Sequence, residues 1–180
     1  MLLPPDSAFR FINGYKAVLL EVLKASGATP GGDIIRDLSA ARSHAKQRQS
    51  SITEALFALE ARGSAIDADV VRALQTLKVA QWVYLRDSAQ YSVFIDMEVQ
   101  NAYAVKALTI PIRRVASGCP ATFEAGLFEF CGHYVCDGII VNPVYLGTNY
   151  KSQFNAAYAS IRKAGKFHAK AAVSPPLSGK

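Results

Sequence analysis

The sequence predicts an α+β protein in which N-terminal helices pack on a five-stranded antiparallel β-meander and a C-terminal closing helix follows. Up to residue 78, apolar residues recur at three- and four-residue intervals, which is typical of amphipathic helices. From residue 79 to 147, aromatic and β-branched runs alternate with short polar turns, which favours strands and hairpins. Strands and helices do not alternate around glycine-rich turns, so a dinucleotide or phosphate-loop enzyme is not expected, and no cofactor is predicted.

The helical part, residues 1–78, begins with a helix capped by Asp6 or Ser7, directly after two prolines. Glycine-rich segments at 26–27 and 30–32 end this helix and form a loop. A second helical region begins at Asp33. Ser51 with Glu54 forms a capping box, so residues 33–62 are either one long helix or two. A further helix begins at Asp67.

The sheet part, residues 79–147, follows from the period-two segments and the turns between them. Short links between consecutive strands favour an antiparallel meander. Thr148 or Asn149 is expected to cap the closing helix, residues 148–165. Residues 1–170 are expected to form a single domain, and residues 171–180 a disordered tail. Strands are expected at 81–87, 91–96, 102–108, 122–130 and 133–141.

Composition limits the cellular setting. The chain has 180 residues, of which 51% are hydrophobic, and it can bury a sizeable core. No apolar run reaches the length of roughly 18 residues that a membrane span requires. Three cysteines, an odd number, without a signal-peptide pattern favour reduced thiols and a cytoplasmic location. Composition does not predict an oligomeric state.

Positive charge is concentrated near the C-terminus. Residues 148–180 contain six Lys and Arg and no Asp or Glu, whereas the rest of the chain is balanced. A clustered basic segment can bind nucleic acid or an acidic protein, or it can simply aid solubility. The candidate polyanion-binding residues are Lys151, Arg162, Lys163, Lys166 and Lys170.

A cysteine nucleophile is a second possibility. Cys119 lies in a loop before an expected strand and His133 lies on the next strand, so a hairpin could bring the thiol to a base. Asp137, on the same strand face as His133, could orient the imidazole. The string Ser117-Gly118-Cys119 followed by this histidine resembles cytotoxic-necrotizing-factor-type glutamine deamidases, which implies a deamidase or hydrolase. Pro120 directly follows the cysteine and has no backbone N–H. The sequence therefore departs from an oxyanion site that would use the N–H of the residue after the nucleophile.

The segment from Cys131 to Asp137 has the residue types of a metal site but an unsuitable geometry. If Cys131 and Gly132 form a two-residue turn, Phe130 pairs with His133. His133 and Cys136 then lie on opposite faces of a strand, so no metal site is predicted. The two cysteines are not expected to form a disulfide.

The interpretation that these observations favour is a non-enzymatic binding or regulatory module for a protein or nucleic-acid partner. The alternative is a cysteine-dependent hydrolase or deamidase that uses Cys119 and His133. Proximity of these two side chains would separate the two interpretations.

Overall fold

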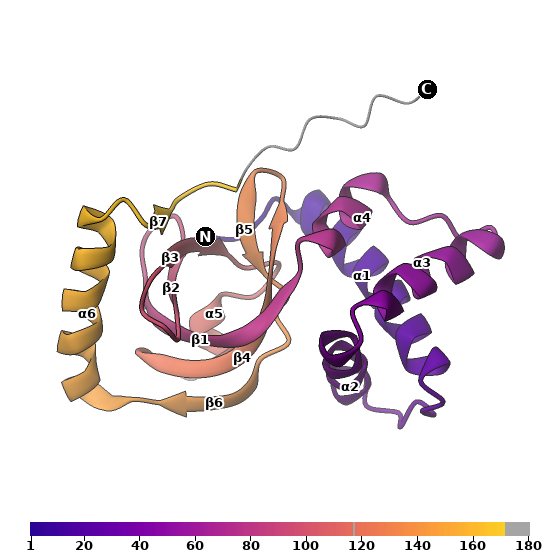
Figure 1. The fold of residues 1–180 in the computed structure, drawn as a ribbon, viewed down its shortest axis with the longest axis horizontal. Helices are drawn as coiled ribbons and strands as arrows, with labels where there is room; N and C mark the ends of the chain where they lie inside the picture. Colours follow the sequence, from indigo (N-terminus) through magenta and orange to yellow (C-terminus); the bar gives the residue numbers. More distant parts are fainter. Residues whose placement is uncertain (117, 172–180) are drawn as a thin grey trace.

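The computed structural model describes residues 1–116 and 118–171. Within these residues the fold is α+β, with six helices and a mixed sheet of seven strands. Four helices gather on one side and the strands on the other (Figure 1). The expected disordered tail lies outside the described residues except for Ala171, which is buried and donates its N–H to the Gly132 carbonyl at 3.3 Å.

Residues 33–62, which the sequence left open, form two helices. Asp33 caps the first by accepting hydrogen bonds from the N–H groups of Ile35 and Arg36. The expected capping box does not form: Ser51 lies inside the second helix, its hydroxyl donates to the carbonyl of Arg48 at 2.7 Å, and Glu54 pairs with Arg48 at 2.9 Å. The helices are α1 (Pro5–Ala25), α2 (Ile34–Gln47), α3 (Ser50–Ala61), α4 (Ala68–Gln75), α5 (Ile112–Val115) and α6 (Gly147–Lys163).

The sheet is not purely antiparallel, which corrects the expected meander. Five strands close into a ring in the order β1-β2-β3-β5-β4 and back to β1, and β3 pairs with β5 in parallel. Neighbours in an all-antiparallel ring must alternate in direction, which an odd number of strands cannot do. The strands are β1 (Lys78–Asp87), β2 (Ser92–Asp96), β3 (Ala102–Lys106), β4 (Ala121–Phe130), β5 (His133–Cys136), β6 (Val141–Tyr145) and β7 (Phe167–His168).

Aromatic side chains fill the interior of the ring. Trp82, Tyr84, Phe94 and Phe123 are fully buried there. The indole N–H of Trp82 donates to the carbonyl of Ala125 at 3.1 Å, which satisfies its one polar atom. Trp82 and Tyr84, the alternating aromatic residues of β1, are therefore part of the core and do not form an exposed stacking surface.

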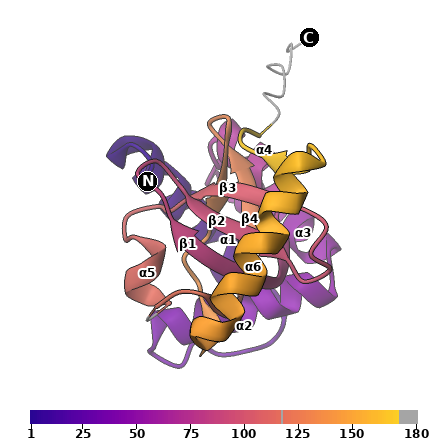
Figure 2. The ribbon, with the colours of Figure 1, turned by 90° about the vertical axis from the view of Figure 1, so that its left-hand side faces the viewer.

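Helix α6 packs on the outside of the ring, across the strands (Figure 2). Tyr158 and Ile161 are buried against Val83, Val93 and Ile95. The helix begins at Gly147 without a side-chain cap, so neither Thr148 nor Asn149 has the expected capping role. After α6 the chain adds the short strand β7 beside β3, which the sequence pattern did not predict.

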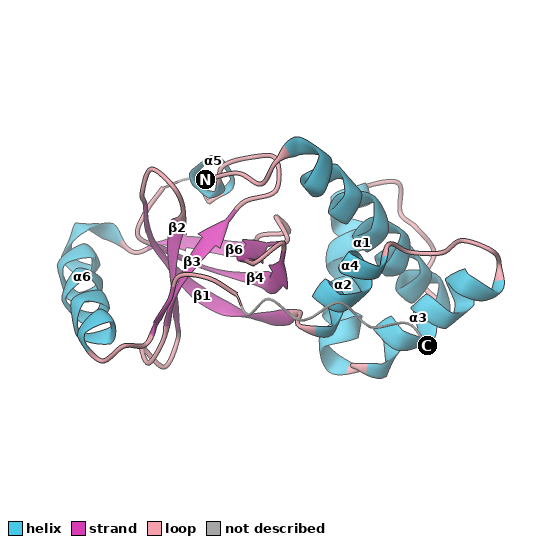
Figure 3. Ribbon diagram, turned by 90° about the horizontal axis from the view of Figure 1, so that it is seen from above, coloured by secondary structure: helices cyan, strands magenta, loops and turns pink. Residues whose placement is uncertain are grey.

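The N-terminal helices lie on the other side of the ring (Figure 3), where α1 and α4 contact the strands and α3 packs on α1. Phe11 of α1 stacks on Phe128 of β4 with ring centroids 3.9 Å apart, and Phe130 adds a third ring at 5.3 Å from Phe11. This aromatic contact joins the helical side to the ring.

Candidate binding groove and the predicted site residues

Cys119 and His133 are not brought together. Cys119 lies just before β4, and His133 pairs with Phe130 at the other end of this ten-residue strand. A strand advances about 3.3 Å per residue, so the two side chains are roughly 30 Å apart along β4. The hairpin expected to join them is present, but the cysteine lies at its far end. The described structure therefore does not assemble the expected pair.

His133 lies in a positively charged setting. Burial, together with the charges of Lys106, Lys170 and the N-terminus, lowers the pKa of His133. The imidazole is therefore neutral at physiological pH. No carboxylate forms a salt bridge with it among the described residues.

Asp137 binds Arg42 of α2 and does not orient a histidine. Both side chains are fully buried, and an Nη1–Oδ2 distance of 2.9 Å joins them. Arg42 Nη1 also donates to the carbonyl of Ile139 at 2.5 Å, and Tyr15 Oη donates to Asp137 Oδ2 at 3.3 Å. Burial and the nearby Asp137 raise the pKa of Tyr15, so its hydroxyl stays a donor. We call Tyr15, Arg42 and Asp137 the buried cluster.

The buried cluster connects three elements that are distant in sequence. Arg42 also approaches Glu124 of β4 at 3.4 Å, and Glu124 binds Lys46, one turn further along α2, at 2.6 Å. A buried ion pair of this kind fixes the relative position of the elements that carry it. It sets α2 against β4 and the segment after β5.

The Cys131–Asp137 segment forms the hairpin expected from its turn residues. Phe130 pairs with His133, and Leu127 pairs with Cys136. Burial raises the pKa of the Cys136 thiol, whereas Cys131 is exposed, and neither forms a disulfide. Within residues 1–116 and 118–171, no three His, Cys, Asp or Glu side chains are grouped to hold a metal ion.

The turn residue Cys131 leads to a stability prediction. Cys131 and Gly132 have φ values of 52° and 72°, and two-residue hairpin turns with positive φ at both positions favour Asn-Gly. Cys131→Asn is expected to stabilise the protein by about 0.5–1 kcal/mol, measured by urea denaturation. Cys131→Val is the control and should destabilise, because a β-branched residue is strained at positive φ. Equal stability of the two variants would contradict the prediction.

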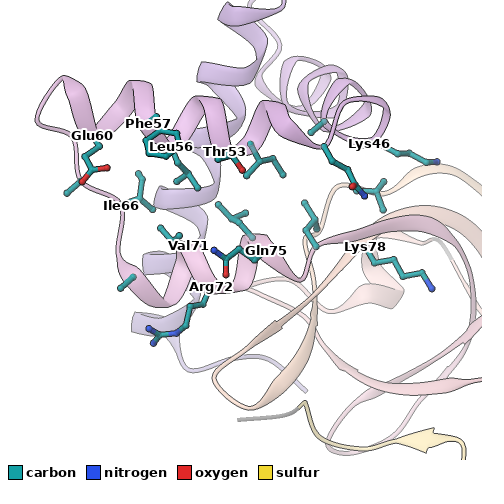
Figure 4. A pocket seen from close by; sticks show the side chains of 18 residues that line it. Lys46, Thr53, Leu56, Phe57, Glu60, Ile66, Val71, Arg72, Gln75 and Lys78 are labelled. Carbon is teal, nitrogen blue, oxygen red and sulfur yellow. The ribbon is translucent and has the colours of Figure 1, made fainter. Parts of the chain in front are cut away.

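One feature that the sequence did not predict is a groove of about 950 Å³ between α3 and α4. Leu56 and Thr53 of α3 point across it toward Val71 and Gln75 of α4 (Figure 4). The end of α2 and the start of β1 close one end of the groove. Its walls are mainly apolar.

The groove exists because α3 is apolar on more than one face. Ala55 and Leu59 are buried against α1, but Leu56 is only partly covered and Phe57 is 67% exposed. A helix that is apolar on several sides is usually covered on all of them. Within the described residues, the groove side of α3 has no covering element. The sequence contains one indication of this uncovered face: Phe57 is an apolar residue that falls outside the helical stripe formed by Ile52, Leu56 and Leu59.

Charged side chains line the groove unevenly. Lys46 and Lys78 lie at the end beside the strands, and Glu60 lies at the opposite end (Figure 4). Arg72 borders the α4 side and pairs with Asp69. The rim therefore has three basic side chains and one acidic side chain.

The five candidate polyanion-binding residues are all exposed and lie on α6 or after it. Arg162 lies over the rings of Tyr158 and Phe167, at 5.9 and 5.8 Å from their centroids. Lys166 Nζ is 3.3 Å from the side-chain oxygen of Gln100. The last acidic residue before this segment is Asp137, which is buried.

Comparisons with protein-family models, with curated proteins and with solved structures found no match to this chain. Among the described helices, none combines the length and apolar character needed to cross a membrane. The fold and the groove together define an α+β protein with an open, largely apolar groove between two helices.

Proposed function

We propose that this protein is a non-enzymatic binding module that holds an apolar segment of a protein partner in the groove between α3 and α4. The groove itself is the observation that carries the proposal. Phe57 is 67% exposed beside partly covered aliphatic side chains. Aromatic residues surrounded by aliphatic contacts are typical anchors of protein interfaces.

The length and the helical walls of the groove favour a protein segment as its occupant. Its volume of about 950 Å³ is at the upper end of the ~300–1,000 Å³ common for small-molecule sites. Helices supply 12 of its 18 lining residues, and α3, with 12 residues, is about 18 Å long. A groove of this length between helices suits an inserted apolar face.

Substitution of Phe57 tests the proposal. Peptides of about 16 residues, long enough for four helical turns, would be selected from a display library on the wild-type protein. Phe57→Asp is expected to weaken their binding at least about tenfold, because it places a charge at an apolar anchor. Fluorescence anisotropy of labelled peptides measures the effect.

The matched control is Phe9→Asp, which changes an exposed phenylalanine on α1 outside the groove. Both variants should melt close to the wild-type temperature, since both rings are largely exposed. Peptides that bind Phe57→Asp as well as they bind Phe9→Asp would place the binding surface elsewhere and overturn the proposal.

A second candidate function is polyanion binding by α6. Basic side chains are exposed along this helix and after it, with no acidic residue beyond Asp137. Lys and Arg contacts to phosphate release counterions, which favours binding at low salt. The candidate residues are Lys151, Arg162, Lys163, Lys166 and Lys170.

The sheet is a less suitable nucleic-acid surface than α6. The return of β4 beside β1 makes the ring a Greek key, as in OB-folds, which bind oligonucleotides on the face of their second and third strands. Here Val93, Ile95 and Ala102 on these strands are buried with Tyr158 of α6. A likeness of fold does not assign function, and the accessible positive charge is on α6.

A triple substitution tests this second candidate. Replacing Arg162, Lys163 and Lys166 with Gln is expected to weaken heparin or oligonucleotide binding and to lower its salt slope by about 0.7–0.9 per lost phosphate contact. The control replaces three exposed basic residues of the helical side, Lys16, Lys24 and Arg36, with Gln. An equal loss in both variants would indicate a net-charge effect and would contradict a site on α6.

A further inference from the structure

We infer that Arg86 of β1 and Arg162 of α6 together bind the phosphate backbone of a nucleic acid. This inference rests on the second candidate function, polyanion binding by α6, and names the class of ligand and the pair of residues that holds it. Arg86 lies outside the basic C-terminal segment, so the distribution of charge along the sequence did not indicate it.

The two guanidinium groups lie over the same aromatic ring. Cζ of Arg86 is 5.3 Å from the centroid of the Tyr158 ring, and Cζ of Arg162 is 5.9 Å from it. Arg162 also lies 5.8 Å from the centroid of Phe167. Aromatic faces attract guanidinium groups. Two positive charges are therefore held as neighbours at the surface where α6 crosses the strands (Figure 2).

A β-bulge directs Arg86 toward α6. The register between β1 and β2 shifts by one residue after Tyr84, and Arg86 pairs with Val93. In a regular strand, Arg86 would share the interior face of the ring with Tyr84. The bulge places it on the outer face instead, beside Val93, which packs against α6. Bulges that redirect a side chain are frequent beside functional sites.

The pair is oriented but not neutralised. Nη1 of Arg86 donates to Oδ1 of Asn155 at 2.9 Å, and Nδ2 of Asn155 donates to the carbonyl of Lys151 at 2.8 Å. Among the described residues, no carboxylate forms a salt bridge with Arg86 or Arg162. The adjacent Asp87 accepts a hydrogen bond from a serine hydroxyl of β2 at 2.6 Å. A guanidinium has five N–H donors, so most donors of the pair have no partner in the described part of the chain.

The chemistry around the pair favours a nucleic acid over an anionic membrane. Guanidinium groups bind phosphate oxygens through two parallel N–H bonds, and two oriented groups suit neighbouring phosphates of one strand. Over its last two turns, the exposed side of α6 carries the small residues Ala156, Ala159 and Ser160. A phosphate backbone can approach such a surface closely, whereas a membrane-binding helix inserts large apolar side chains.

The experiment measures the fluorescence anisotropy of labelled single-stranded DNA, single-stranded RNA and duplex DNA, each of about 20 nucleotides per strand, at several salt concentrations. The wild-type protein is expected to bind at least one of them, with an affinity that falls as salt rises. Arg86→Gln and Arg162→Gln should each weaken binding about tenfold at low salt. Each should also lower the salt slope by about 0.7–0.9, because one phosphate contact is lost.

Two further variants separate geometry from charge. Arg86→Lys keeps the charge but not the planar fork, so it should weaken binding by a smaller factor than Arg86→Gln and leave the salt slope unchanged. Asn155→Ala removes the acceptor that orients Arg86 but no charge, and it should have the same two effects. The control is Arg36→Gln combined with Arg114→Gln, which removes two exposed arginines from α2 and α5 and should change the affinity far less. The substituted side chains are at least partly exposed, so the variants should melt close to the wild-type temperature.

The outcomes separate this inference from the second candidate function. If the triple variant of Arg162, Lys163 and Lys166 loses binding while Arg86→Gln binds like wild type, the inference is overturned and polyanion binding by α6 remains. Binding to heparin or to phosphatidylserine vesicles, without binding to any of the three nucleic acids, would overturn the assignment of the ligand. Equal losses in Arg86→Gln and in the control would indicate a net-charge effect and would contradict the pair. A wild-type protein that binds none of these probes would refute the inference and the second candidate function together.

Discussion

Replacing Arg42 with methionine is expected to destabilise the protein by about 3–5 kcal/mol. Methionine keeps much of the aliphatic volume but removes the only cation that pairs with Asp137 among the described residues. A fully buried carboxylate then lacks its partner, and the carbonyl of Ile139 loses a donor at 2.5 Å. Urea denaturation of the variant and the wild type measures the difference.

The loss of folding stability caused by Arg42→Met should depend on pH. Burial raises the pKa of Asp137, and Arg42 opposes this rise. Without Arg42 the folded state binds a proton more readily than the unfolded chain does. Stability relative to wild type is then retained at low pH and lost as pH rises through the folded pKa. The deficit should be smaller at about pH 5 than at about pH 8.

Two controls identify the cause. Lys46→Met removes an exposed partner of Glu124 and should cost less than about 1 kcal/mol. The double variant Arg42→Met with Asp137→Leu removes both buried charges and should recover part of the lost stability. A double variant as unstable as the sum of the two single variants would show that the pair itself contributes little.

Gly126→Ala is expected to destabilise the protein by about 3 kcal/mol, from overpacking and displacement of the buried cluster. A methyl group at this position on β4 would lie 2.8 Å from Cγ of Asp137 and 2.8 Å from Cδ1 of Leu77, with Oδ2 of Asp137 closer still. Asp137 would have to move away from Arg42. Thermal and urea denaturation measure the loss.

Gly31→Ala is the matched control. A Cβ at Gly31 would meet only Asp37 Oδ1, at 3.5 Å, and the residue does not have a positive φ. That substitution should change stability by less than about 1 kcal/mol. Comparable losses at the two positions would show that contact with Asp137 is not the cause.

The buried cluster also affects the proposed groove. Ala45 and Lys46 line the groove and lie one turn beyond Arg42 on α2. Displacement of α2 would therefore move the end of the groove that carries the basic side chains. Peptide affinity in Arg42→Met, measured where the variant is still folded, should fall more than in Lys46→Met.

Local sequence patterns determined the class of the fold and many of its elements. The change from helical to period-two spacing separates the helical side from the strands near residue 78. Cys131 and Gly132 form the predicted turn, and the register that follows from it, Phe130 with His133, is observed. These features depend on neighbouring residues, whose backbone preferences and periodicity can be read along the chain.

Only the tertiary structure decided how these elements meet. The parallel pairing of β3 with β5 arises because five strands close into a ring, a property of the whole sheet that no single strand records. The separation of Cys119 from His133 follows from the length of β4, and the pairing of Asp137 with Arg42 joins residues 95 positions apart. The groove depends on which faces of α3 remain uncovered. Long-range contacts of this kind are set by packing and closure, because local periodicity states which faces are apolar but not which elements will cover them.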